Sequence, residues 1–415
     1  MNDSLNRVLK AISASRDNMI ELQRLLSAVP AISPQSDGEG EMEKARVLAG
    51  WLTENGFPEP QWYYAPDDRA KEGKRPSLVV TIPGEKEGPA FWIMSHLDIV
   101  PPGEMSLWNS DPYTVVVEED RIIGRGVEDN QQGLVSSVFA ARALLENDIT
   151  PPVPVKLLFV ADEENGSEYG IQYLLEKEDL FGDDDYILVP DGGDPEGRTL
   201  EIAEKRTLWL KFRVLGQQCH ASRPGMGTNA FVAGSALVCA LAGLSEKFPE
   251  RDDLFDPPVS TFVPTKKEAN VPNINTMPGE DVFYLDSRIL PSVAVEDVYA
   301  EMDRIQGEIE KSHGVRIERS EVQRTESVPT DPGCGLVSLM KDVVKEERGI
   351  EPHPIGIGGG TVGAYLRNRG LETVVWATID ETAHMPNEYC KIENLVGDAR
   401  VMARLMLAGP AAGDR

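Results

Sequence analysis

Short apolar runs that end in polar residues recur through the first half of the chain, and they constrain its fold most. The runs in "AFWIMSH", "VKLLFVADEE" and "YILVPDGG" are nearly continuous, as strands buried on both faces are. Between the first two, "NQQGLVSSVFAARALLEN" places apolar residues along one stripe of a helix: Leu134, Val138, Ala141 and Leu145. Strand alternating with helix predicts an α/β layer fold for residues 1–205.

The pattern of elements changes near residue 206. Residues 206–322 have the order strand, helix, strand, strand, helix and strand, which is that of a ferredoxin-like βαββαβ unit. Residues 323–415 then resume helix, strand and helix. A chain of 415 residues is also too long for one typical domain. We therefore predict a two-domain α/β protein, in which the segments 1–205 and 323–415 form a larger domain around an inserted ferredoxin-like domain.

Charge and cysteine usage exclude several classes of function. The 69 acidic and 41 basic residues give a net charge of −28, and this field repels nucleic acid and anionic membranes. No stretch approaches the roughly 20 apolar residues of a membrane span, and the N-terminal segment lacks the apolar core of a signal peptide. The four cysteines form no C-x-x-C pair, which suits a reducing compartment. We expect a cytoplasmic protein with neither nucleic acid nor membrane as a partner.

Metal-capable side chains follow strand after strand in the predicted sheet. In open α/β sheets, ligands bind beyond the carboxyl ends of the strands. The residues at or just after these ends, together with an acid that precedes a helix, are His96, Asp98, Asp129, Asp162, Glu163, Glu164, Asp191, Asp380, Glu381 and His384. One such residue means little, since an acidic strand end is usually a solvated turn. Several of them at one edge of one sheet predict a metal centre.

The candidate ligands predict two divalent ions, zinc first, with cobalt or manganese as alternatives. Imidazole and carboxylate ligands suit Zn, Mn or Co, and thiolates are absent from the set. Two histidines with three of these carboxylates exceed the needs of one tetrahedral ion. Two ions that share one carboxylate use all five ligands. Glu164 can then be a ligand, while Glu163 takes a proton from the attacking water. Two cations also remove the repulsion among adjacent acids.

The glycine-rich stretch "GGGTVG", Gly358 to Gly363, fits the G-x-G-x-x-G pattern of dinucleotide sites, with Asp380 and Glu381 as candidate ribose contacts. Such a site needs a strand before the glycines, and "EPHPIGI" makes a poor strand. The helix after them, "AYLRNRG", is also short. We therefore expect no dinucleotide there. The turn can instead present backbone N–H groups to a carboxylate, or it can be a tight turn without a ligand.

Seven motifs in order resemble the M20 family of metallopeptidases over nearly the whole chain: "SHLDIVPPG", "GRGVEDNQQG", "DEENGS", "VPDGG", "GQQCHASRPGMGTNA", "DSRILP" and "AHMPNEYCKIENL". That family includes succinyl-diaminopimelate desuccinylase, acetylornithine deacetylase, aminoacylase and glutamate carboxypeptidase. The resemblance implies a zinc-peptidase-like catalytic domain with an inserted lid domain. Because that lid is often a dimerisation surface in the family, we expect a homodimer through residues 206–322.

The same resemblance implies a role for individual residues. Five of them are implied to be ligands of two zinc ions: His96, Asp129 and Asp191 for one, and Asp129 as a bridge with Glu164 and His384 for the other. Glu163 is implied to be the general base, and Asp98 to orient His96. His220, from the lid, is implied to stabilise the oxyanion. Further positions are implied to contact substrate: Asn229, Arg288, Gly359, Gly360 and Thr361.

Together these features predict a di-zinc amidohydrolase that cleaves an amide bond next to a free carboxylate. Arg288 offers a two-pronged match to that carboxylate. The expected substrate is an N-acyl amino acid or a short peptide, so a dipeptidase or carboxypeptidase of the same family is the alternative. A non-catalytic metal-binding homologue is the rival from another class. The intact pair Glu163 and Glu164 argues against it, because a pure binding site has no need for the base.

Overall fold

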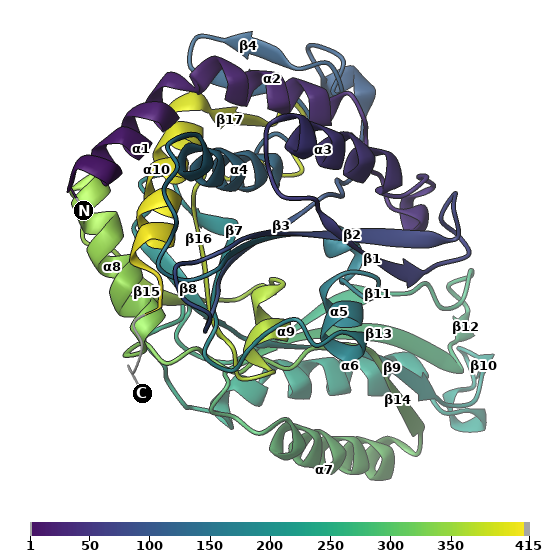
Figure 1. Ribbon diagram of the computed structural model, residues 1–415. Coiled ribbons are helices and arrows are strands. Elements are labelled where there is room, and N and C mark those ends of the chain that lie inside the picture. Colours follow the sequence, from purple (N-terminus) through teal and green to yellow (C-terminus); the bar gives the residue numbers. More distant parts are fainter. Residues whose placement is uncertain (1, 411–415) are drawn as a thin grey trace. The chain divides into compact units, whose positions relative to one another are not determined.

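The computed structural model describes residues 2–410, which form two compact units (Figure 1). The larger unit comprises Met1–Ile202, Thr330–Ile355 and Tyr365–Arg415, and the smaller comprises Ala203–Pro329 and Gly356–Ala364. The sequence leads us to expect the segment 356–364 in the larger domain, whereas it groups with the smaller unit. Backbone hydrogen bonds explain this placement, because the Lys205 N–H donates to the Ile357 oxygen and the Gly356 N–H to the Leu254 oxygen.

An eight-stranded sheet forms the centre of the larger unit. Four neighbouring strands run parallel: β6 (Val155–Val160), β3 (Phe91–His96), β7 (Tyr186–Asp194) and β16 (Glu372–Thr378). The sheet continues beyond them with β2 (Lys74–Ile82) and β1 (Gln61–Pro66) on one side, and with β8 (Thr199–Glu204) and β15 (His353–Ile357) on the other. All residues of β3 are buried, as its apolar run predicts. The carboxyl ends of the four parallel strands therefore meet at one edge of the sheet.

Helix α4 (Gln131–Glu146) packs on β3 and β7 and contacts α1 (Asn2–Ala14), α2 (Arg16–Ser27) and α10 (Ile392–Ala408). It is buried almost all round, although Leu145 of the predicted stripe is only half-buried. Gly133 allows α4 to approach β7 closely, because a Cβ at this position would lie 2.4 Å from the Pro190 oxygen. The remaining longer helices of this unit are α3 (Met42–Glu54) and α8 (Gly335–Arg348). Among residues 2–410, none of the helices has the length and apolar character needed to cross a membrane.

The stretch before the glycine-rich turn is a strand, so our expectation for "EPHPIGI" was wrong. Strand β15 lies at the edge of the sheet beside β8. Proline and glycine lower the strand propensity of "HPIGI", but an edge strand tolerates proline because one side of its backbone needs no partner. The helix after the turn, α9 (Gly363–Arg367), has only five residues. The short helix remains the argument against a dinucleotide site.

The smaller unit has the predicted βαββαβ order. Its elements are β9 (Arg206–Leu215), α6 (Ala230–Ala242), β11 (Thr261–Lys267), β13 (Glu280–Ile289), α7 (Val295–His313) and β14 (Arg316–Arg324). The strands form an antiparallel sheet in the order β11-β13-β9-β14. Alternate residues of β9 and β13 point into one core, where the rings of Phe212 and Phe283 stack 5.1 Å apart. The mixed α/β fold class is therefore confirmed.

Candidate metal centre

The parallel strands bring the five predicted ligands together in the larger unit. His96 is the last residue of β3, and Asp191 lies within β7. Glu164 lies in the short 3₁₀ helix η3 (Glu163–Asn165) that follows β6, and Asp129 lies two positions before the first residue of α4. His384 follows β16. Residues separated by up to 288 positions along the chain thus meet at one edge of the sheet, as the strand-end pattern predicts.

Asp129 lies between the two histidines. Its Oδ1 is 2.9 Å from Nε2 of His96, and its Oδ2 is 3.0 Å from Nε2 of His384. Nε2 of His96 is also 3.5 Å from Oδ1 of Asp191, and Nε2 of His384 is 3.0 Å from Oε2 of Glu164. Each oxygen of Asp129 therefore faces a different histidine, and each histidine is also close to a different second carboxylate. A carboxylate shared by two cations requires such an arrangement.

The donor set suits divalent cations. Two groups have ligand atoms within 4.8 Å of one another: His96 with Asp129 and Glu164, and His96 with Glu163 and Asp191. These groups combine imidazole nitrogens with carboxylate oxygens, the ligands that zinc, cobalt and manganese accept. Buried like charges are costly without balancing cations, and burial together with the charge of Asp191 raises the pKa of Glu163 well above its usual range. The residues present therefore fit a pair of divalent ions.

The carboxylates raise the pKa of both histidines. Hydrogen bonds to Asp129 and Glu164 raise the pKa of His384 to about 10. Burial opposes protonation of His96, but the charge of Asp191 and the hydrogen bond to Asp129 outweigh it and lift the pKa of His96 well above its usual range. An imidazole must be neutral to bind a metal ion. Both histidines must therefore lose a proton when ions enter this site.

Zinc binding to the apoprotein near pH 7 is expected to release protons, and its affinity is expected to weaken as the pH falls. The sign follows from the raised histidine pKa values, because at pH 7 the imidazoles hold protons that the ions must displace. Isothermal titration calorimetry in buffers of different ionisation enthalpy measures this release. An apparent binding enthalpy that is the same in every buffer would contradict it.

Asp98 connects two parts of the site. Its carboxylate accepts the backbone N–H of Glu163 on one oxygen and that of Glu164 on the other, both at 3.1 Å. Its backbone oxygen is 3.0 Å from Nδ1 of His96, and its Oδ1 is 3.5 Å from the same nitrogen. A partner on Nδ1 directs Nε2 of His96 toward the ligand cluster. Asp98 therefore contacts both His96 and the turn of Glu163 and Glu164, and its role in orienting His96 stays a prediction.

Two buried acids that the sequence analysis did not single out brace the loops of Asp129 and His384. Glu388 accepts the backbone N–H groups of Gly126, Glu128 and Asp129 at 3.0–3.1 Å. Glu128 in turn accepts the N–H of Asp380 at 2.7 Å and the hydroxyl of Thr382 at 2.8 Å. Strand β17 (Tyr389–Lys391) pairs with β5 (Arg121–Ile123) beside them. Glu128 adjoins Asp129 in the sequence and Glu388 lies four positions after His384, and that proximity was the available signal.

Asn130 supports a second ligand. Its side-chain amide donates to Oδ1 of Asp191 at 2.7 Å and to the Pro190 oxygen at 2.6 Å. Its Oδ1 accepts the His96 N–H at 3.3 Å. One amide thus ties the end of β7 to the end of β3. No pattern in the sequence distinguishes this asparagine from an ordinary residue at the start of a helix.

The other predicted site residues lie in the smaller unit. His220 is exposed, and its Nδ1 accepts the N–H of Ser222 at 3.1 Å, so a neutral ring carries its proton on Nε2, where it can donate. Asn229 caps α6 by accepting the N–H groups of Phe231 and Val232. Gly359 and Gly360 are exposed. Thr361 donates its hydroxyl to Oε1 of Glu204 at 2.6 Å.

The guanidinium of Arg288 is already occupied. Its Nε and Nη2 donate to the two carboxylate oxygens of Asp286 at 2.8 and 3.1 Å. Its Nη1 donates to Oγ1 of Thr207 at 3.1 Å and to the Gly358 oxygen at 3.0 Å. The two prongs that match a substrate carboxylate are therefore held by a carboxylate of the chain itself.

Known proteins resemble this chain over most of its length. A model of peptidase family M20/M25/M40 matches residues 92–408. An uncharacterized metallohydrolase of Methanocaldococcus jannaschii is 37% identical over 410 residues, which covers 94% of this chain and 99% of the relative. A succinyl-diaminopimelate desuccinylase of Nautilia profundicola is 24% identical, covering 89% of this chain and 94% of the relative.

Two solved structures share the fold. Human carnosine dipeptidase 1 superposes with a TM-score of 0.72 at 16% identity, covering 97% of this chain and 98% of the other. A dinuclear metal-binding peptidase of Bacillus subtilis superposes with a TM-score of 0.68 at 16% identity, covering 95% and 98%.

Proposed function

Because this chain belongs to peptidase family M20/M25/M40 and is a metallohydrolase of amide or peptide bonds, we propose that it cleaves the amide bond of an N-acyl amino acid next to a free carboxylate. The observation that carries the proposal is the position of Asp129, whose two oxygens face His96 and His384 separately. Two zinc ions are the proposed cofactors, with cobalt or manganese as alternatives. Such ions, when bound, polarise the substrate carbonyl and lower the pKa of a water toward about 7.

Glu163 is the proposed general base. Burial and the charge of Asp191 raise the pKa of its carboxyl group, which makes the carboxylate a stronger base than an exposed glutamate. It takes the proton of the attacking water while the water oxygen bonds to the carbonyl carbon. It then gives that proton to the amide nitrogen as the C–N bond breaks, which yields an amine and a carboxylic acid. The acid passes its remaining proton to the amine or to solvent and leaves as a carboxylate. The N–H at Nε2 of His220 is the proposed donor to the oxyanion.

A dipeptidase or carboxypeptidase is the alternative activity. The desuccinylase relative supports an N-acyl amino acid as substrate, and the carnosine dipeptidase structure supports a dipeptide. A panel of N-succinyl amino acids, N-acetyl amino acids and dipeptides, each assayed with zinc, cobalt and manganese, separates these proposals. We expect faster turnover of N-acyl amino acids. Preference for dipeptides would favour the alternative, and two bound ions without hydrolysis of any amide would favour a binding protein.

Asp286→Asn is expected to lower KM for substrates that carry a carboxylate by about two- to fivefold. The reason is that Asp286 competes for the prongs of Arg288, and a partly exposed ion pair is worth up to about 1 kcal/mol. Steady-state kinetics measures the change. Glu280→Gln is the matched control, because it removes an exposed acid of the same strand that pairs with Arg213 instead. A higher KM in Asp286→Asn would mean that Asp286 orients Arg288 for the substrate.

We also propose a homodimer through the smaller unit, in the cytoplasm. Two apolar side chains of α6, Phe231 and Val232, are 45% and 52% exposed, and Val263 of the edge strand β11 is 52% exposed. All four cysteines are free, which suits a reducing compartment. Light scattering coupled to size-exclusion chromatography tests the dimer.

A further inference from the structure

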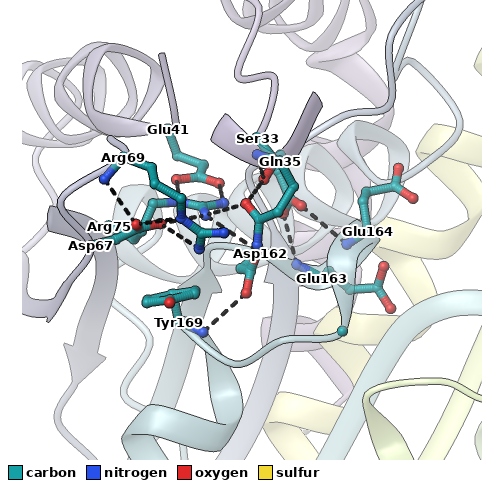
Figure 2. Close-up of polar contacts among 12 residues, drawn as sticks. Ser33, Gln35, Glu41, Asp67, Arg69, Arg75, Asp162, Glu163, Glu164 and Tyr169 are labelled. Atoms are coloured by element: carbon teal, nitrogen blue, oxygen red, sulfur yellow. Dashed lines mark hydrogen bonds and ion pairs between the residues drawn. The ribbon is translucent and has the colours of Figure 1, made fainter. Parts of the chain in front are cut away.

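A buried cluster of charges lies behind the turn that carries Glu163. It consists of Glu41, Asp67, Arg75 and Asp162, which we call the Arg75 cluster (Figure 2). Arg75 of β2, Glu41 and Asp162 are 0% exposed, and Asp67 is 4% exposed. Figure 2 shows the carboxylates of Glu163 and Glu164 pointing away from this cluster. Because no part of Arg75 reaches solvent, it has no route to contact a substrate.

Arg75 joins three carboxylates with one guanidinium. Its Nε donates to Oε2 of Glu41 at 2.6 Å, and its Nη2 donates to the other oxygen of that carboxylate. Its Nη1 lies 3.4 Å from Oδ2 of Asp67 and 3.3 Å from Oδ1 of Asp162. A guanidinium is planar and rigid, so one that bonds several acids holds them at fixed positions relative to one another. Asp162 is therefore tied to β2 and, through Glu41, to the start of α3.

Asp162 sets the direction in which the chain leaves β6. Its φ of +64° lies in the left-handed region, which costs energy for any residue except glycine and is tolerated best by asparagine and aspartate. Its Oδ2 accepts the N–H of Tyr169 at 3.0 Å, and its backbone oxygen accepts the N–H of Ser167 at 2.6 Å. Gln35 donates to the same Oδ1 that faces Arg75, at 3.4 Å. These contacts over-determine a conformation that the backbone alone does not favour.

The turn is thus held on two sides. Asp98 holds the N–H groups of Glu163 and Glu164, and the Arg75 cluster holds Asp162, which precedes them. Beyond Asp162 the two glutamates diverge, with Glu164 directed to His384 and Glu163 grouped with His96 and Asp191. A rotation at Asp162 moves both carboxylates together. Misplacement of a catalytic group by about 1 Å can cost about 100-fold in rate.

We propose that Arg75 is a positioning residue, which acts through Asp162 to aim Glu163 and Glu164 into the metal centre. This inference rests on the proposed function, since Glu163 is the base only in that account. A cluster that only stabilises the fold predicts a different result. Asp67 and Asp162 face the same Nη1 of Arg75 at nearly the same distance, so neutralising either acid would then have the same effect on kcat.

The comparison of Asp162→Asn with Asp67→Asn tests the proposal. Asparagine suits the left-handed conformation at residue 162, and each variant removes one charge that faces Arg75. We expect Asp162→Asn to lower kcat about 10- to 100-fold with KM within about twofold of wild type. The visible absorption spectrum of the cobalt-loaded protein should change as well, because Glu164 shifts. Asp67→Asn should keep kcat and the cobalt spectrum, although it also disrupts the ion pair of Asp67 with Arg69.

Equal losses of kcat in the two variants, in parallel with their melting temperatures, would overturn the proposal, as would an unchanged cobalt spectrum in Asp162→Asn. If Asp162→Asn does not fold, Arg75→Lys tests the proposal in its place. Lysine keeps the positive charge but cannot span Glu41 and Asp162 together. Arg75→Lys should then reproduce the loss of kcat at constant KM, and wild-type kcat in it would overturn the proposal. The cobalt spectrum reports on the turn even if another residue proves to be the base, so this test and that of the proposed function fail separately.

Discussion

Glu163→Gln is expected to lower kcat by about 10²- to 10⁴-fold while the protein keeps its metal content. General acid–base catalysis contributes a factor of this size, and glutamine keeps the shape of the side chain without its ability to take a proton. The five proposed ligands are other residues, so their number does not change. Glu163 is half-buried within the acidic cluster, where the charge of Asp191 helps to raise its pKa. Steady-state kinetics and elemental analysis of the same preparation measure both quantities.

The matched control for this variant is Glu168→Gln. Glu168 lies five residues further along the chain and is exposed, and its replacement removes the same charge from the surface. We expect it to keep the rate and metal content of the wild type. Hydrolysis near the wild-type rate in Glu163→Gln would remove Glu163 from the mechanism, whereas loss of bound metal in that variant would make it a ligand.

Asp129→Asn is expected to weaken the binding of both metal ions together, by about 100-fold or more at each site. Even residues that only support a ligand typically change metal affinity 10- to 100-fold, and Asp129 faces both histidines directly. An asparagine presents one oxygen and one NH₂ group, and the NH₂ group cannot bind a cation. Calorimetric titration of the apoprotein with zinc measures both sites in one experiment.

Substitutions of ligands that belong to only one of the two sites should each weaken that site alone. Asp191→Asn is expected to weaken the site that includes His96, and His384→Ala the site that includes Glu164. Each should leave about one tightly bound ion. Retention of one full equivalent of tightly bound zinc in Asp129→Asn would mean that the two sites do not share this carboxylate.

The fold class and the meeting of the five ligands could be predicted from the sequence for one physical reason. Apolar runs such as "LLFVA" identify buried strands, and the carboxyl ends of parallel strands lie at one edge of a sheet. His96 and Asp191 could therefore be expected together although 95 positions separate them. Strand β15 escaped the same reasoning because an edge strand needs neither an apolar run nor a backbone partner on both sides.

The supporting residues could not be predicted because their partners are backbone groups. Glu388 accepts three N–H groups of the loop before α4, and a buried acceptor of this kind looks like a surface acid in the sequence. Asn130 contacts the backbone of His96 and Pro190 in the same way. Arg75 differs, because its partners are carboxylates, and Glu41 and Asp162 lie far from it in the sequence. The contact between Asp286 and Arg288 could have been predicted from the sequence, because the "DSR" motif contains both and residues two apart on a strand share a face.

Anomalous diffraction at the zinc absorption edge, from crystals of the zinc-loaded protein, tests most directly whether two cations share Asp129. We predict two peaks about 3.5–4 Å apart, one beside His96 and Asp191 and the other beside Glu164 and His384, with Asp129 between them. A single peak, or zinc bound away from these residues, would contradict the account.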